Sequence, residues 1–230
     1  MNDLYVAGTD TGVGKTVLSL LLMQFLFEQG KRPFYLKPLQ TGCKTPRDED
    51  SDAAFIYRHV ESLRDGDPGE SVIYCFANPK APFFAARDEG SAIDLKLMER
   101  IVAEKSRAYS PLVIEAAGGV LVPVAEGTLI VDIMQTTGAK VLIAARAGLG
   151  TINHTLLSIE ALQARGIKPA AIIFIDAAET PPEMIAENRE AIEACSGIKV
   201  AGVIGRIADF SHPPRDSYRP IEFLFREGLV

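Results

Sequence analysis

Short apolar runs and longer mixed segments alternate along the chain. Within the runs, apolar residues do not alternate with polar ones, which is typical of strands in a parallel sheet that is covered on both faces. Six such runs are predicted strands: residues 4–7, 32–37, 111–115, 140–145, 170–175 and 199–204. Helices are predicted over residues 16–29, from residue 51 onward, over 94–107 and over 151–164. Strands separated by helices predict right-handed crossovers and an α/β fold with a doubly wound, mostly parallel sheet.

Two segments are predicted to lie outside the centre of this sheet. Residues 38–50 form a polar loop after the second strand, which we expect to end at Lys37. The segment from Tyr74 to Pro82 contains two prolines, and proline cannot donate the backbone hydrogen bond that a central strand needs. With 230 residues, 47% of them hydrophobic, the chain can bury a large core, and we expect residues 1–230 to form a single domain.

A glycine-rich turn, from Gly8 to Thr16, joins the first predicted strand to the first predicted helix. Strand, glycine-rich turn and helix is the order that a phosphate-binding loop requires. Backbone N–H groups and the start of the helix attract phosphate oxygens, Lys15 would reach the β- and γ-phosphates, and the Thr16 hydroxyl would bind Mg²⁺. Thr9 stands where the general pattern has a glycine, so a turn that binds nothing is the alternative.

Several polar residues are expected at one edge of the sheet. Ligands of such sheets bind beyond the carboxyl ends of the strands. Gly8, Lys37, Glu115 and Arg146 all fall at the ends of predicted strands. We therefore expect one cleft to bring them together.

The acidic residues suit a magnesium–nucleotide complex, because Mg²⁺ in such a complex prefers one or two carboxylates together with water. Glu115 is the first candidate ligand and Asp52 is the second, although Asp52 is equally compatible with an ordinary helix cap. Lys37 is either a solvated lysine or a second cation beside Lys15 that stabilises negative charge during phosphoryl transfer.

Composition narrows the classes of partner and the cellular compartment. The 24 Lys and Arg residues against 30 Asp and Glu residues give a net charge of −6, and no basic cluster is present, which argues against a nucleic-acid partner. Cys43, Cys75 and Cys195 lack metal-ligand spacing and are expected to be free thiols in a reducing cytosol. No leader and no run of membrane-spanning length is recognised, so we expect a cytoplasmic protein without a membrane partner.

Six short motifs resemble those of the dethiobiotin synthetase family and cover most of the chain in the right order. They include the whole phosphate loop, and the family's own Gly-Thr-Asp-Thr loop accounts for the displaced glycine. The motifs lie at residues 8–16, 37–38, 51–53, 74–82, 115–119 and 148–154.

The resemblance implies a P-loop NTPase-like fold and an ATP- and Mg²⁺-dependent ligase. Members of this family close the ureido ring of dethiobiotin from 7,8-diaminopelargonate and CO2, through a carbamate and a mixed carbamic–phosphoric anhydride, and release ADP and phosphate. They act as homodimers. The implied catalytic residues are Thr11, Lys15 and Lys37, with Thr16, Asp52 and Glu115 as magnesium ligands.

The resemblance also implies the binding residues. Those expected to contact the nucleotide are Gly12, Val13, Gly14, Lys15, Thr16, Val17, Asp52, Glu115, Ala116, Ala117 and Gly118. Those expected to contact the substrate are Thr41 and the turn Gly150, Thr151, Ile152 and Asn153, which would bind the substrate carboxylate from the partner subunit. A helix start with free N–H groups suits a carboxylate.

The chain departs from the family pattern at three places. Many relatives have Glu at the position of Gly12. Many also have glycine at the position of Ala116. Relatives often carry Asn-Asp at Ile175-Asp176 and a proline in the region of Ile204. Because Ile175 has no amide group to bind adenine, we predict a weaker preference for ATP over other nucleoside triphosphates.

Three alternatives share this type of fold. A cobyrinate-type amidoligase normally carries a glutaminase domain, for which 230 residues leave no room. A regulatory switch ATPase of the MinD/ParA type would have a lysine early in the phosphate loop, where Asp10 stands, and a membrane-binding C-terminal helix. The segment Ile221–Arg226 is short and mixed and is expected to pack against the protein. An iron–sulfur reductase needs a paired-cysteine ligand set, which this sequence lacks.

Overall fold

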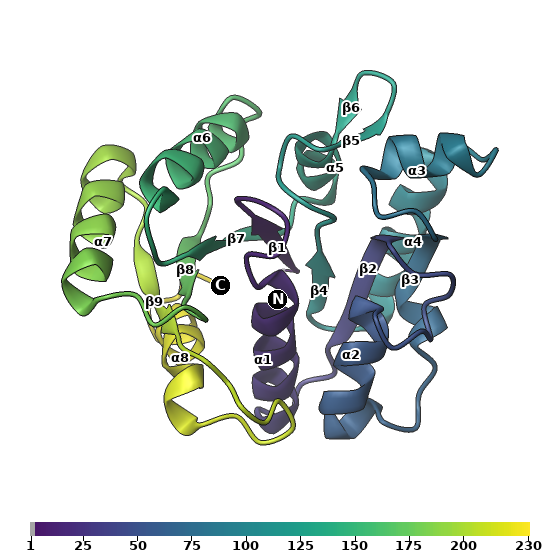
Figure 1. Cartoon of the computed structure of the whole chain (residues 1–230). Coiled ribbons are helices and arrows are strands. Elements are labelled where there is room, and N and C mark those ends of the chain that lie inside the picture. The colour runs from purple at the N-terminus through teal and green to yellow at the C-terminus, as the bar shows by residue number, and fades with distance from the viewer. Residues whose placement is uncertain (1–2) are drawn as a thin grey trace.

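The computed structural model describes residues 3–230, and within this range seven parallel strands form one sheet in the order β3-β2-β4-β1-β7-β8-β9 (Figure 1). A separate antiparallel pair, β5 and β6, lies beside it. The strands are β1 Leu4–Gly8, β2 Phe34–Thr41, β3 Val72–Phe76, β4 Leu112–Glu115, β5 Pro123–Ala125, β6 Thr128–Leu129, β7 Lys140–Arg146, β8 Ala171–Ile175 and β9 Val200–Ile204.

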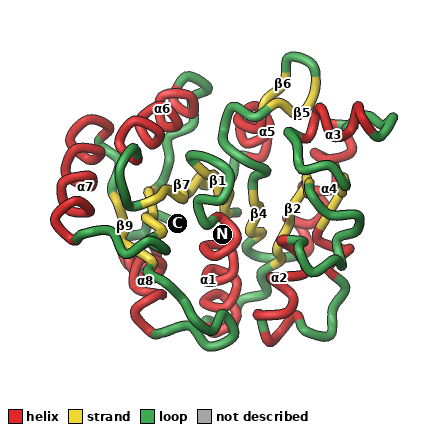
Figure 2. Tube along the Cα trace, in the orientation of Figure 1, coloured by secondary structure: helices red, strands yellow, loops and turns green. Residues whose placement is uncertain are grey.

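Helices cover both faces of the sheet (Figure 2). Within residues 3–230 the α-helices are α1 Lys15–Glu28, α2 Asp52–His59, α3 Pro82–Asp88, α4 Leu95–Ala108, α5 Ile130–Thr137, α6 Thr151–Gln163, α7 Pro182–Ser196 and α8 Arg219–Arg226. Three short 3₁₀-helices, Glu61–Leu63, Pro68–Ser71 and Arg215–Tyr218, complete the set.

Successive residues of each strand point into two different hydrophobic cores. In β1, Leu4 and Val6 pack with α1, α2 and α8, whereas Tyr5 and Ala7 pack with α4, α5, α6 and α7. The residues of β4 and β8 are divided between the two cores in the same way, so these strands bury both of their faces, which is why their sequences are almost entirely apolar. The doubly wound parallel α/β fold is confirmed.

The second strand is longer than predicted, and the prediction that Lys37 ends it is wrong. β2 continues through Pro38 to Thr41, so the first part of the expected polar loop is a buried strand. The reason is a change of neighbour: β2 pairs with β4 up to Leu36 and with β3 from Lys37 onward. Pro38 is tolerated because the pairing with β4 has already ended there.

The proline-containing segment forms an edge strand and a helix. Residues 74–76 belong to β3, which lies at the edge of the sheet, so the prediction that this segment is not a central strand is confirmed. Among the helices that the sequence pattern did not predict, α3 and α7 begin with a proline at their first position. Proline is favourable there because the first N–H groups of a helix have no partner within the helix.

The C-terminal segment packs against the sheet, as predicted. Ile221 and Leu224 of α8 are completely buried, and α8 contacts β9 and α1. Among residues 3–230, none of the helices combines the length and the apolar character needed to cross a membrane.

Candidate active site

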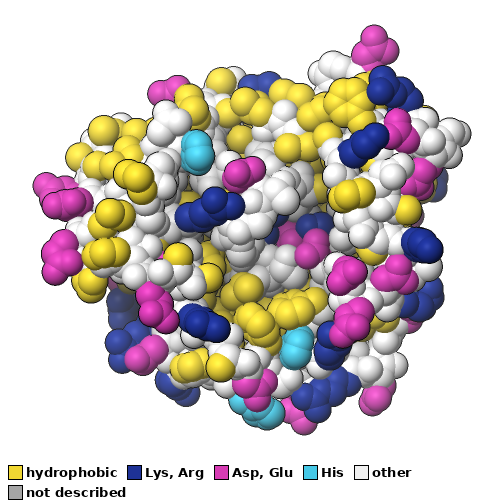
Figure 3. Space-filling model, viewed as in Figure 1, with side chains coloured by type: hydrophobic (Ala, Val, Ile, Leu, Met, Phe, Trp, Pro, Cys, Tyr) yellow, Lys and Arg dark blue, Asp and Glu magenta, His cyan; other side chains and the backbone are white. Residues whose placement is uncertain are grey.

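A cleft lies at the carboxyl-terminal edge of the sheet, above β1, β2 and β4, and Figure 3 shows it as a hollow near the centre of the molecular face with acidic and basic side chains inside. Much of the predicted site lines it. The predicted residues in its wall are Thr11, Gly12, Gly14, Lys15, Thr16, Lys37, Thr41, Asp52, Glu115, Ala117 and Gly118. The far wall comes from residues 79–82, which lead into α3.

The phosphate loop turns sharply between β1 and α1. Gly12 and Gly14 have φ angles of +68° and +89°, a left-handed conformation that a residue with a Cβ rarely adopts. A Cβ on Gly14 would also lie 2.6 Å from Cγ2 of Ile175. Glycine is therefore needed at Gly14 both for its backbone angle and for space.

Lys15 begins α1 and lies along this loop. Its Nζ donates a 2.8 Å hydrogen bond to the carbonyl oxygen of Asp10. Burial lowers the pKa of Lys15 to about 8, and the positive charge of Lys37 acts in the same direction. A phosphate group in the loop would supply the negative charge that the ammonium needs.

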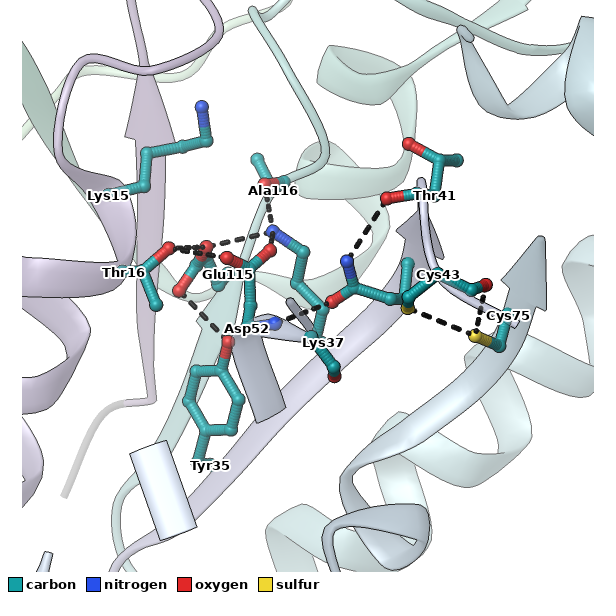
Figure 4. A network of polar contacts seen from close by, with 12 residues as sticks. Lys15, Thr16, Tyr35, Lys37, Thr41, Cys43, Asp52, Cys75, Glu115 and Ala116 are labelled. Atoms are coloured by element: carbon teal, nitrogen blue, oxygen red, sulfur yellow. Dashed lines mark hydrogen bonds and ion pairs between the residues drawn. The ribbon is translucent and has the colours of Figure 1, made fainter. Parts of the chain in front are cut away.

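Two carboxylates, one hydroxyl and one ammonium meet at the floor of the cleft (Figure 4). The Thr16 hydroxyl lies 2.8 Å from Oδ1 of Asp52 and 3.0 Å from Oε1 of Glu115. Lys37 Nζ lies 2.7 Å from Oδ2 of Asp52 and 2.8 Å from Oε1 of Glu115. These residues come from α1, α2, β2 and β4, so only the folded chain assembles them.

The charged side chains at the floor of the cleft interact strongly because they are shielded from water. The side chains of Lys37 and Glu115 are 5% and 0% exposed. Burial alone would lower the pKa of Lys37, but the two carboxylates outweigh burial and hold that pKa above its ordinary value. Burial would likewise raise the pKa of Asp52, yet Lys37 keeps it below the ordinary value. Lys37 and Asp52 are therefore both ionised at neutral pH.

Two positioning residues were not predicted from the sequence. Tyr35 is fully buried, and its hydroxyl donates a 3.0 Å hydrogen bond to Oε2 of Glu115. Gln40 accepts a 3.2 Å hydrogen bond from the backbone N–H of Asp52 at the start of α2. Tyr35 lies two positions before Lys37 on β2. Because alternate residues of a strand share a face, the sequence could have placed Tyr35 on the same face as Lys37.

The donor set fits magnesium held together with a nucleotide. Across residues 3–230, no three His, Cys, Asp or Glu side chains cluster as a complete metal cage. Two carboxylates and a hydroxyl are instead what Mg²⁺ uses when it keeps several waters and binds substrate phosphates. Thr16, Asp52 and Glu115 are the residues that would hold it.

Other predicted residues lie near the cleft but outside its wall. Val13 is buried and Val17 is partly buried in the core under the phosphate loop. Ala116 contributes its backbone carbonyl, which accepts a 3.1 Å hydrogen bond from Lys37. Arg146 is exposed, and its Nη2 lies 3.5 Å from the carbonyl oxygen of Thr11.

The predicted turn for the substrate carboxylate lies away from the cleft of its own chain. Gly150 adopts a left-handed conformation before α6, and Asn153 is exposed on the first turn of that helix. Thr151 is buried, and its hydroxyl lies 3.3 Å from that of Thr155. The turn does not line the cleft formed by its own chain.

Ile175 and Asp176, which stand where relatives often carry Asn-Asp, make contacts within the protein. Ile175 packs on Gly14, as described above. The carboxylate of Asp176 accepts hydrogen bonds from the backbone N–H and the hydroxyl of Thr180, and its own N–H donates to the carbonyl of Ile204. Asp176 therefore orders the loop after β8.

Two of the cysteines are neighbours in space although they are far apart in sequence. The Sγ atoms of Cys43 and Cys75 lie 3.5 Å apart, and both residues are free thiols. Burial raises the pKa of Cys75 to about 12 and also raises the pKa of Cys43. Their thiolate fraction at neutral pH is therefore small.

The parallel sheet and the phosphate loop at its carboxyl edge define a P-loop NTPase. The family model described as an AAA domain matches residues 2–214. Among solved structures, the cell division ATPase MinD of Pyrococcus furiosus is similar over all of both chains, with a TM-score of 0.63 and 12% identity. The MinC:MinD complex of Aquifex aeolicus gives a TM-score of 0.62 at 17% identity, over 99% of this chain and 96% of that chain. Likeness at such low identity concerns the fold alone.

Sequence relatives identify the family. The ATP-dependent dethiobiotin synthetase BioD of Anaeromyxobacter sp. strain Fw109-5 is 34% identical over 217 residues, which covers 94% of this chain and 95% of that protein. The protein of the same name from Anaeromyxobacter sp. strain K is 40% identical over 175 residues, or 76% of each chain. The chain belongs to the ATP-dependent dethiobiotin synthetase family, and it is an ATP-dependent ligase.

Proposed function

We propose that the protein converts 7,8-diaminopelargonate, CO2 and ATP into dethiobiotin, ADP and phosphate in biotin biosynthesis. One amine of the substrate is carboxylated to a carbamate, the γ-phosphoryl group of ATP moves to a carbamate oxygen, and the second amine attacks the mixed anhydride. Ring closure expels phosphate. The observation that carries the proposal is Lys37 beside Thr16, Asp52 and Glu115 in the cleft next to Lys15.

Different residues of the cleft bind the phosphates and stabilise the charge of the transferring group. Gly12, Gly14 and the start of α1 bind the phosphates through backbone N–H groups, and Lys15 neutralises the β- and γ-phosphate oxygens. Thr11 and Lys37 face the carbamate and the transferring phosphoryl group. Magnesium, when bound, adds positive charge at the phosphate oxygens.

Substrate recognition uses both walls of the cleft and a second subunit. Thr41 lies in the wall opposite the phosphate loop and would contact the diamine. The turn before α6 would bind the carboxylate of a substrate held in the partner subunit, since a helix start suits an anion. This proposal requires a homodimer. A cytoplasmic location remains a prediction from the free thiols.

The direct test supplies diaminopelargonate, bicarbonate, Mg²⁺ and ATP to the purified 230-residue chain and detects dethiobiotin by mass. Leaving out the diamine should abolish both the product and most ADP release. Steady ATP hydrolysis without the diamine, and no dethiobiotin with it, would instead favour a switch ATPase.

A further inference from the structure

The ammonium of Lys37 uses all of its hydrogen-bonding capacity on the protein. A lysine ammonium has three N–H donors and no acceptor. Lys37 Nζ lies 2.7 Å from Oδ2 of Asp52, 2.8 Å from Oε1 of Glu115 and 3.1 Å from the carbonyl oxygen of Ala116. In this arrangement no donor remains for a carbamate or a phosphoryl oxygen.

The same two carboxylates are the ones that suit a magnesium ion. Oε1 of Glu115 contacts both the Thr16 hydroxyl and the Lys37 ammonium, and Asp52 contacts the same pair through its two oxygens (Figure 4). A divalent cation on these oxygens would lie against a buried positive charge. Like charges in a buried site repel strongly, because little water screens them.

We propose that Lys37 and a divalent cation compete for the carboxylates of Asp52 and Glu115, so that cation binding releases the Lys37 ammonium into the cleft. The released ammonium keeps the Ala116 carbonyl as a partner and gains free donors for the substrate. This inference deepens the proposed function and rests on it for the identity of the substrate. It explains how a lysine held by two carboxylates can act on a third anion.

The carboxylate framework is built to remain in place while Lys37 changes partner. Tyr35 bonds the other oxygen of Glu115, Oε2, which Lys37 does not touch. The N–H of Asp52 is held by Gln40. Both supports are independent of the ammonium, so the carboxylates stay oriented after it leaves.

The test measures binding of Mn²⁺ alone, without nucleotide, by electron paramagnetic resonance of the free ion. The variant Lys37→Met keeps an unbranched side chain that is one atom shorter and removes its charge. Removing the competitor should tighten Mn²⁺ binding about tenfold relative to the wild type, although the same variant loses turnover. Adding Asp52→Asn to Lys37→Met should cancel the gain.

Lys15→Met is the matched control, because Nζ of Lys15 bonds a backbone carbonyl and no carboxylate. It should weaken nucleotide binding and change Mn²⁺ affinity much less than Lys37→Met. A folded Lys37→Met variant that binds Mn²⁺ no more tightly than the wild type would overturn the proposal. Because these assays contain no diaminopelargonate, their outcome is separate from the failure or success of dethiobiotin formation.

If Lys37→Met does not fold, a second measurement on the wild type tests whether a divalent cation releases the Lys37 ammonium. Acetic anhydride modifies free lysine amines, and mass spectrometry reports each site. Saturating Mg²⁺ should increase the modification of Lys37, which is 4% exposed, relative to Lys15. An unchanged ratio would contradict release of the ammonium.

Discussion

At the residue scale, Glu115 divides its two carboxylate oxygens between different partners. Oε1 faces Thr16 and Lys37, whereas Oε2 accepts a hydrogen bond from Tyr35. Supporting partners of this kind orient metal ligands, and their loss typically reduces metal affinity or activity about 10- to 100-fold. Glu115 could be named as a candidate ligand because it ends an apolar strand, but its support by Tyr35 depends on β2 lying beside β4.

Tyr35→Phe tests that support. We expect the Mg²⁺ concentration for half-maximal rate to rise about tenfold, because Glu115 loses its orienting bond. The free energy of unfolding should fall by about 1 kcal/mol, since one buried acceptor loses its donor. Titrating Mg²⁺ in the rate assay measures the first effect, and urea unfolding measures the second.

Tyr5→Phe is the matched control for this substitution. Tyr5 is a similarly buried tyrosine on β1, which is separated from β2 by β4, and it packs into the opposite core. It should leave the magnesium requirement unchanged. Equal effects of the two substitutions on that requirement would mean that Tyr35 only fills space.

The prediction about nucleotide preference depends on Ile175. Its side chain packs on Gly14 and offers no hydrogen bond to adenine. We expect only a modest preference for ATP in initial rates measured with ATP, CTP and GTP. A preference above about 100-fold, or roughly 2.7 kcal/mol, would contradict this expectation.

At the scale of elements, α2 connects the candidate site to the C-terminal part of the chain. Its first residue, Asp52, faces Lys37, and its last residue, His59, packs against Phe210 with a centroid distance of 5.8 Å. Nδ1 of His59 lies 3.0 Å from the Ser211 hydroxyl. The start of this helix was predictable from Ser51 as its cap, whereas the contact of His59 with Ser211, 152 positions further along the chain, was not.

His59 should make stability depend on pH. Burial, assisted by the charge of Arg58, lowers its pKa, so the folded state favours the neutral ring. Below pH 6.5 the unfolded state binds a proton that the folded state resists, and stability therefore falls as the pH drops from 6.5 through the folded pKa. Urea unfolding between pH 7.5 and 5.5 should show a shallower loss for His59→Gln than for the wild type. A slope identical in both would exclude His59 as a source of acid sensitivity.

At the scale of the whole molecule, the two ends of the proposed substrate site lie on different parts of the surface. The phosphate loop and Lys37 lie in the cleft, whereas the turn before α6 does not line it. Leu149 in this turn is 95% exposed, and Leu157 of α6 is 54% exposed. If a subunit interface covers this turn, we expect it to bury these two leucines.

Mixed dimers test whether the turn acts across that interface. Lys37→Gln should inactivate the cleft, and Asn153→Asp should repel the substrate carboxylate while suiting the helix N-terminus. Each variant alone should be nearly inactive. If the two were unfolded and refolded together, half of the dimers would contain one intact site, which gives about a quarter of the wild-type activity.

Mixing without refolding is the control for this experiment. No recovery after refolding, with dimers present by light scattering, would mean that the turn does not complete the partner's site. Recovery confined to the refolded mixture supports a shared site.

The sequence by itself determined the local features. The phosphate loop, the apolar strands and the capped helices depend on residues close together in the chain, so glycine spacing and hydrophobic periodicity predicted them. Glu115 and Thr16 could be proposed as magnesium ligands for the same reason, because each ends or begins a predictable element.

Only the tertiary structure decided which distant residues meet. The strand order places β4 between β1 and β2, which brings Glu115 to Lys37 and both to Asp52. The change of pairing partner along β2 extends that strand past Lys37, and the edge position of β3 brings Cys75 to Cys43. Strand order is set by packing of the whole sheet, and no local pattern encodes it.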